Sequence, residues 1–169
     1  MHAMFRMFAG YNAWANEQLY AAAASLNDAD YRADLGAFFK SVHGTLNHIL
    51  VADRVWMHRF TGAGDAPKDL GAILFESFAD LRAARAAEDQ RIIDYIAGLS
   101  DADLKAVFSY RRLTTPDTMT QPLAPALSHF FNHQTHHRGQ VHALLTRLTG
   151  DAPSLDLMPF QRLSGMGMS

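Results

Sequence analysis

The chain of 169 residues contains no cysteine. Disulfides, thiolate metal sites and a cysteine nucleophile are therefore excluded, and any bound metal ion must use nitrogen or oxygen ligands. No apolar run in the sequence reaches the roughly 18 residues that a membrane-spanning helix needs. Residues 1–6 lack the basic segment, apolar run and cleavage site of a signal peptide. We therefore expect a cytoplasmic protein that does not engage a membrane.

An excess of charge of either sign is also lacking. The 15 lysines and arginines nearly balance the 17 aspartates and glutamates, which leaves a formal net charge of −2. Such a balance offers no basic groove for nucleic acid and no general attraction to an anionic partner. The length is that of one domain, and no repeat or linker interrupts it, so we treat residues 1–169 as a single domain.

Hydrophobic periodicity predicts four long helices, at about residues 3–26, 41–60, 73–99 and 123–148. Residues 27–30 are expected to cap a short helical turn. The helical period lapses between residues 100 and 122, where residues 107–110 and 118–121 favour a short β-hairpin around a turn at 114–117. Gly150 should end the last helix, and the tail from residue 151 to 169 should wrap the surface. The sequence thus predicts an all-α four-helix bundle with a hairpin before the last helix.

Histidine is the residue that the sequence has in excess: there are nine, and five of them fall between His129 and His142. A helical wheel of residues 123–148 places His137 on the apolar face and His133 at its edge, whereas His136 and His142 point away. Two histidines four residues apart can hold one metal ion between them. The same pair also arises by chance in many helices, so the spacing alone does not establish a metal site.

A third ligand would have to come from another helix. On the helix predicted over residues 41–60, His43 and His48 flank the apolar stripe at similar angles, so periodicity does not choose between them. The small or slim neighbours of His48 give it a slight preference, because they leave space for an ion and its solvent.

Three segments resemble the DinB/YfiT-like family of metalloenzymes: residues 11–16 (YNAWAN), residues 45–56 (TLNHILVADRVW) and residues 132–140 (NHQTHHRGQ). The resemblance implies a four-helix bundle, often a homodimer, whose metal is held by one histidine of the second helix and two of the fourth. By position these are His48, His133 and His137, with one divalent ion per chain. Zinc suits three nitrogen ligands best, and nickel, iron and manganese are alternatives.

The resemblance also implies a function. Relatives include thiol-dependent transferases and isomerases, so we expect a metal-dependent enzyme that transfers a low-molecular-weight thiol to a small-molecule substrate, or a hydrolase. The alternative is a non-catalytic metal-binding or stress-associated module whose ion only stabilises the bundle. An open pocket at the ion would favour the enzyme, and a fourth protein ligand would favour the module. Metal affinity should fall as pH drops through about 6.5, where free histidine is protonated.

Asp53 and Arg138 are candidates to support the metal ligands, although no catalytic residue is assigned. Asp53 lies on the apolar side of its helix, where an acid needs a partner. It could support a ligand or act as a general base. We favour the simpler interpretation that it forms an ion pair with Arg138 or Arg59 and fixes helix packing.

Overall fold

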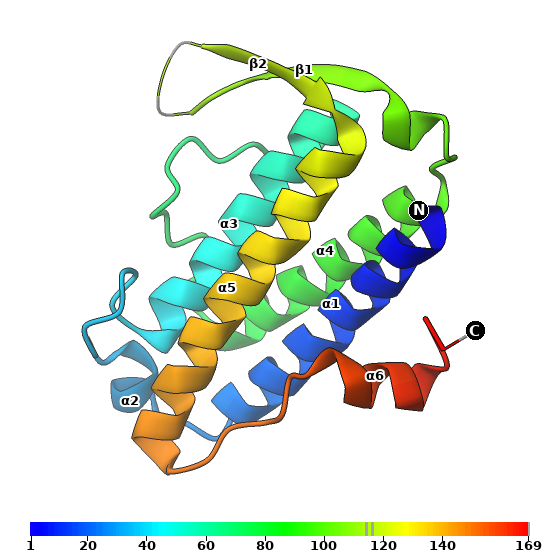
Figure 1. Cartoon of the computed structure of the whole chain (residues 1–169). Coiled ribbons are helices and arrows are strands. Elements are labelled where there is room, and N and C mark those ends of the chain that lie inside the picture. Colours follow the sequence, from blue (N-terminus) through cyan, green and yellow to red (C-terminus); the bar gives the residue numbers. More distant parts are fainter. Residues whose placement is uncertain (114, 116, 169) are drawn as a thin grey trace.

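The computed structural model describes residues 1–113, 115 and 117–168. It confirms the four long helices and the hairpin that precedes the last of them (Figure 1). The elements are α1 (His2–Ala23), α2 (Asp28–Arg32), α3 (Val42–Thr61), α4 (Phe78–Ala97), the 3-10 turn η1 (Asp103–Lys105), β1 (Val107–Arg111), β2 (Thr118–Pro122), α5 (Leu123–Thr149) and α6 (Leu157–Ser164). Of the turn predicted at residues 114–117, positions 114 and 116 lie outside the described residues.

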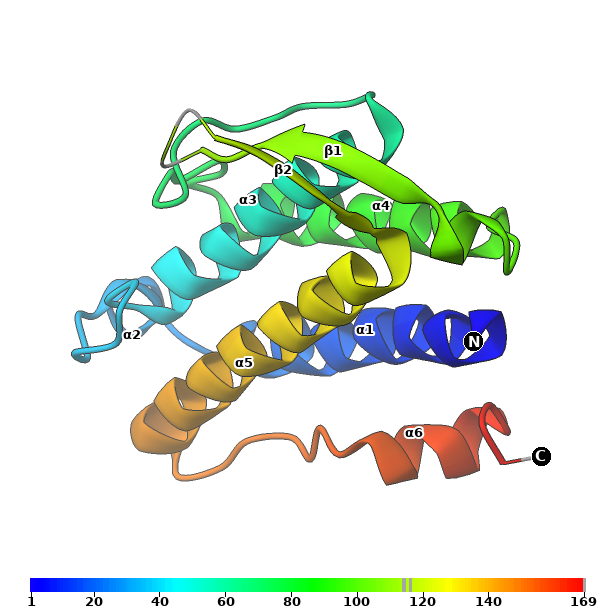
Figure 2. The same ribbon diagram turned by 45° about the horizontal axis from the view of Figure 1, so that its top comes forward.

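The four long helices form a bundle in which α1 packs against α4 and α5, and α3 packs against the same two helices. The antiparallel hairpin pairs Val107 with Pro122 and Arg111 with Thr118, and it lies over the end of α3 and the start of α5 (Figure 1). After α5 the chain turns back and runs along α1 to α6 (Figure 2). None of the described helices combines the length and the apolar character needed to cross a membrane.

Side chains at the helix ends explain where the helices begin and stop. The Asn27 and Ser41 side chains accept hydrogen bonds from backbone amides in the first turns of α2 and α3, as preferred N-cap residues do. Gly150 has a φ of 79° and ends α5, which confirms the expectation from the sequence. At the start of α3, a Cβ on Gly44 would collide with the carbonyl oxygen of Phe39. Glycine at this position therefore lets the preceding loop lie against the helix.

The sequence placed the start of the third long helix too early, because α4 begins at Phe78 rather than near residue 73. The buried side chain of Asn47 explains the difference. Its amide oxygen accepts hydrogen bonds from the backbone amides of Leu74 and Phe75, at 2.9 and 3.0 Å, and its amide nitrogen donates to the Phe75 carbonyl. These bonds hold the segment in a non-helical conformation against α3, and Ser77 then caps α4.

The tail contains a helix, α6, that periodicity did not predict. Phe160 of α6 is buried, with its ring centroid 5.9 Å from those of Tyr11 and Trp14 on α1. The Tyr11 hydroxyl donates a 2.6 Å hydrogen bond to the Leu155 carbonyl. One aromatic cluster thus fastens the tail to the bundle.

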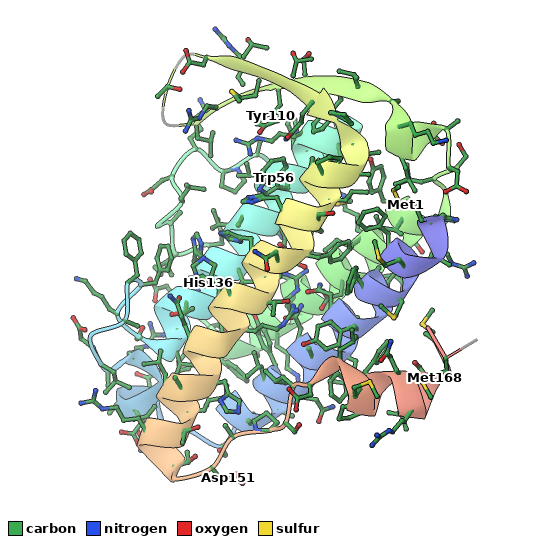
Figure 3. All side chains as sticks on the ribbon, in the orientation of Figure 1. Met1, Trp56, Tyr110, His136, Asp151 and Met168 are labelled. Carbon is green, nitrogen blue, oxygen red and sulfur yellow. The ribbon has the colours of Figure 1, made fainter. Side chains whose placement is uncertain are left out.

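The bundle interior has two apolar clusters with a polar layer between them. On α1, Phe5 belongs to the first cluster and Leu19 to the second, and on α3 these places are taken by Met57 and Leu50. Between the clusters, each long helix contributes buried polar side chains (Figure 3 shows the side chains on the ribbon). We call this set the polar layer; it comprises Asn12, Asn16, Asp53, Arg85, Asp89, Gln134 and Arg138.

Candidate metal centre

His48 of α3 and His133 and His137 of α5 come together where these two helices pack. One ring nitrogen of each lies within 4.8 Å of the others. The Nε2 atom of His137 is 3.1 Å from the Nε2 atoms of both His48 and His133. We call these three residues the histidine cluster. His43 lies outside this cluster, and its Nε2 atom instead donates to the Phe75 carbonyl at 3.1 Å.

Two of the three nitrogen separations fit a shared metal ion, and the third, between His48 and His133, is within 4.8 Å. Zinc binds histidine nitrogen at about 2.0–2.1 Å, so two ligands of a tetrahedral ion would be about 3.3 Å apart. Neighbouring ligands of a six-coordinate ion at the same bond length would be about 3.0 Å apart. The observed 3.1 Å separations lie between these values. The cluster could therefore hold a divalent ion in either geometry.

The proton on His48 is fixed by its backbone partner. The Nδ1 atom lies 2.8 Å from the carbonyl oxygen of Leu70. Because a carbonyl oxygen can only accept, Nδ1 must carry the hydrogen, and in the neutral imidazole Nε2 then presents a lone pair. This lone pair points into the cluster.

The same argument applies to His137. Its Nδ1 atom donates to the side-chain oxygen of Gln140 at 2.8 Å, which leaves a lone pair on Nε2. The Nε2 atoms of His48 and His137 therefore face each other at 3.1 Å with no hydrogen between them. Two lone pairs at this distance repel each other unless a cation lies between them. An oxygen partner on the far ring nitrogen is also the usual arrangement behind a metal-binding histidine.

The surroundings keep the cluster neutral. Burial lowers the pKa of His48 to about 4 and that of His133 to about 3, and it also lowers the pKa of His137. The imidazoles are then already deprotonated at neutral pH, as metal binding requires. Proton competition should consequently begin well below the pH of 6.5 expected from the sequence.

The loop before α3 covers one side of the cluster. The ring of Phe39 stacks on His48 with a centroid separation of 3.7 Å and meets His137 edge-on at 5.6 Å. The next residue, Lys40, has a φ of 67°, an uncommon conformation for a residue other than glycine. Phe39 thus shields the cluster from water and restricts the His48 ring.

The other histidines of α5 stay out of the cluster. His136 is exposed, and its Nε2 atom accepts a 3.3 Å hydrogen bond from the Gln140 side chain. His142 lines a cavity of about 670 Å³ between α5, α1 and the tail, on the opposite face of α5. None of the three cluster histidines lines this cavity. His129 is exposed and lies one turn from His133, with 5.9 Å between the ring centroids.

Asp53 forms an ion pair, as we favoured, but its partner is neither Arg138 nor Arg59. Its Oδ2 atom is 2.6 Å from Nη1 of Arg85 on α4, and its Oδ1 atom accepts a 2.8 Å hydrogen bond from Gln134. Burial raises the pKa of Asp53, while Arg85 and Gln134 counteract this effect. The partner was missed because periodicity alone does not show which face of α4 meets α3. Asp53 therefore ties α3, α4 and α5 together and is not available as a base.

Arg138 is also part of the polar layer rather than a neighbour of the cluster. It donates hydrogen bonds to the side chains of Asn12 and Thr135, and its guanidinium lies 5.2 Å from the ring centroid of Tyr11. All of these contacts lie on the α1 side of α5. Arg138 thus fixes α5 against α1, and the support for the cluster comes from Leu70 and Gln140 instead.

One side of the cluster is open. A cavity of about 230 Å³ is bordered by His48 and His133 and extends toward the hairpin. Within the described ranges, the group of residues able to ligate one ion contains only the three histidines. Three protein ligands with an open side are typical of catalytic zinc sites, whereas structural sites have four protein ligands.

Sequence reasoning missed the neighbours that hold the ligands. Phe39 and Leu70 lie in irregular segments, where no periodicity indicates what they face. Gln140 had a usable signal, since it follows His137 by three residues and so lies on the same side of α5.

The structure is thus a helical bundle in which three converging neutral histidines with an open side could hold a metal ion. The sequence model of the DinB family matches residues 1–164, and the chain belongs to that family. It is similar to "Protein DinB" of Bacillus subtilis (strain 168), with 26% identity over 143 residues and 80% of each chain covered.

Proposed function

We propose that the protein binds one divalent metal ion at His48, His133 and His137 and acts as a metal-dependent enzyme on a small molecule. The observation that carries the proposal is the pair of Nε2 lone pairs that face each other at 3.1 Å beside an open cavity. Each lone pair is imposed by an oxygen atom behind the ring. The fold thus holds two histidines in an arrangement that is unfavourable unless a cation lies between them.

The reaction that we favour is transfer of a low-molecular-weight thiol to an electrophile, with hydrolysis as the variant that uses water. An ion held by three neutral imidazoles keeps its full charge, so it can acidify a thiol or water and polarise a substrate carbonyl. The chain has no cysteine, so the thiol must enter as a cosubstrate. In the transfer, sulfur forms a bond to the electrophilic carbon while the bond from that carbon to its leaving group breaks. The leaving group takes the bonding electron pair, and the thiol proton passes to solvent or to the leaving group.

The residues of this chain supply binding, orientation and exclusion of water. Leu70 and Gln140 hold the two imidazoles in the tautomer that can bind a cation. Phe39 closes one side, and the cavity admits reactants from the other. A module whose ion only stabilises the bundle would not need this opening, which is why we favour an enzyme. Zinc is the preferred ion, with nickel, iron and manganese as alternatives.

The test begins with protein purified without a nickel column. Elemental analysis should find about one divalent ion per chain, or metal-free protein should take up one equivalent of zinc, nickel, iron or manganese. A protein that binds none of these ions contradicts the proposal. A screen of thiols against electrophiles then tests the reaction, with His137→Ala as the inactive control and His136→Ala as the matched active one.

A further inference from the structure

The cavity beside the histidine cluster has a positively charged far end. Its wall continues from His133 to His129, and then to Trp56, whose ring centroid is 5.2 Å from that of His129. Arg59 of α3 and Arg112, just beyond β1, also line it. None of the described residues that line this cavity is acidic.

Arg59 is held in an unusual way for an arginine of this protein. Its guanidinium carbon lies 4.6 Å from the ring centroids of both Trp56 and Tyr110, and its only hydrogen bond in the described structure is a 3.4 Å contact to the Arg111 carbonyl. In the described part of the chain, no carboxylate lies within 4.0 Å of the nitrogens of Arg59 or Arg112. The two aromatic rings orient the Arg59 side chain, while most of its donors remain free.

Other partly buried arginines of the chain have a carboxylate partner, which Arg59 lacks in the described structure. Arg54 has Asp65 as a partner at 3.4 Å, and Arg91 has Glu88 at 2.9 Å. A guanidinium binds a carboxylate through two parallel hydrogen bonds, and removal from water strengthens such charge-assisted bonds. Arg59 thus has the charge, the fixed orientation and the free donors of a carboxylate-binding residue.

We propose that Arg59 binds the carboxylate of a small molecule whose other end reaches the histidine cluster. This inference deepens the proposed function and rests on it. The volume of about 230 Å³ equals that of about eight water molecules at ~30 Å³ each. The ligand is therefore a chain of roughly that many non-hydrogen atoms with an apolar middle, which would lie against Val55 and Trp56 in the cavity wall. The carboxylate could belong to the thiol or to its acceptor, and the two sources are separable by experiment.

The experiment compares probes that differ in one group. The variant Trp14→Phe leaves Trp56 as the single tryptophan, so its fluorescence reports on the cavity. Protein with and without cobalt is titrated with 6-mercaptohexanoate, 6-mercaptohexan-1-ol, hexanoate and hexan-1-ol. Cobalt uptake, followed by its visible absorption, tests the metal site separately. The fluorescence of metal-free protein tests carboxylate binding even if cobalt does not bind.

Each carboxylate should bind at least about tenfold more tightly than its matched alcohol, a difference of about 1.4 kcal/mol. If 6-mercaptohexanoate also binds cobalt-loaded protein more tightly than hexanoate does, the thiol carries the carboxylate; if the two bind equally, the acceptor carries it. Arg59→Met should abolish the preference for carboxylates, and Arg59→Lys should restore part of it. Arg162→Met, on the exposed surface of α6, should leave it unchanged.

Two results would overturn the inference. One is equal binding of acids and alcohols by the protein with Arg59 present. The other is a preference for acids that survives Arg59→Met. Circular dichroism should show that Arg59→Met is folded, since the methionine side chain keeps the apolar contact with Trp56 and Tyr110. If the variant is unfolded, Arg59→Gln replaces it with the same expected loss.

Discussion

The polar layer and the histidine cluster are both largely buried and lie side by side on α5. Their polar atoms nevertheless have different kinds of partner. Gln134 belongs to the layer and directly follows His133, and Arg138 directly follows His137. In the layer, opposite charges meet: Arg85 lies 2.6 Å from Asp53 and 2.9 Å from Asp89. In the cluster, by contrast, the Nε2 lone pairs of His48 and His137 face each other.

This difference separates a structural from a functional use of buried polarity. A buried ion pair is strongly destabilised when one partner is removed, so the layer holds the four helices in one register. The cluster adds no such pairing in the absence of a cation. A buried group with its proton position fixed and its lone pair unmet is instead prepared for a ligand. We therefore expect variants in the layer to change folding, and variants in the cluster to change metal binding.

The largest effect should come from Arg85→Met, which leaves Asp53 and Asp89 buried without their cation. Loss of one partner of a buried pair costs about 3–5 kcal/mol of unfolding free energy. Urea denaturation measures this cost. Arg82→Met, at an exposed position of the same helix, should change the free energy by no more than about 0.5 kcal/mol. Equal effects of the two variants would mean that the layer does not hold the bundle.

The next effect distinguishes neighbouring histidines of α5. His137→Ala removes a nitrogen from the cluster. Loss of a group that only supports a metal ligand weakens metal binding by about 10- to 100-fold, so loss of the ligand itself should reduce metal affinity by more than about 100-fold. His133→Ala and His48→Ala should do the same, while His136→Ala and His142→Ala keep nearly full affinity. Isothermal titration with zinc measures all five variants. Loss of binding in His136→Ala, with retention in His137→Ala, would refute both the helix phase and the site.

Much of this comparison could be predicted from the sequence, because α5 is long and strongly periodic. Its wheel separates His133 and His137 from His136 and His142. Periodicity could not choose between His43 and His48, since that choice depends on which carbonyl, of Phe75 or Leu70, meets each ring. Both carbonyls lie in the irregular segment between α3 and α4. The same limit hid the Arg85 partner of Asp53 and the aromatic contacts that hold α6.

A smaller effect should follow from Gln140→Leu. The variant removes the oxygen that keeps the hydrogen of His137 on Nδ1, so the ring loses its fixed tautomer and orientation. Removing such a supporting partner weakens metal binding by about 10- to 100-fold, and we expect the lower end because His137 keeps its packing against Phe39 and His48. The control is Gln90→Leu on the exposed side of α4. Zinc titration that shows no difference between these variants would contradict the role of Gln140.

The smallest effect is the dependence of zinc affinity on pH, which should differ between the buried histidine cluster and free histidine. Three imidazoles that titrate near 6.5 would each reduce metal affinity by about tenfold at pH 5.5. In the folded protein, burial lowers the pKa of His48 to about 4 and that of His133 to about 3. Protons then compete little for His48 and His133 above pH 5, and the pKa of His137 is also lowered by burial. Zinc affinity should therefore decrease less between pH 8 and 6 than free histidine predicts, and fall steeply below 5.

The metal-free protein should show the complementary trend. An unfolded chain protonates these histidines near pH 6.5, whereas the folded chain does so only near 4 and 3. Between these values the unfolded state binds more protons, so the unfolding free energy decreases as pH falls from 6.5 toward 4. His48→Ala should show a shallower decrease than His136→Ala, because His48 is buried and His136 is exposed. Equal slopes, together with zinc affinity that drops tenfold between pH 7 and 6, would show that the cluster titrates like free histidine.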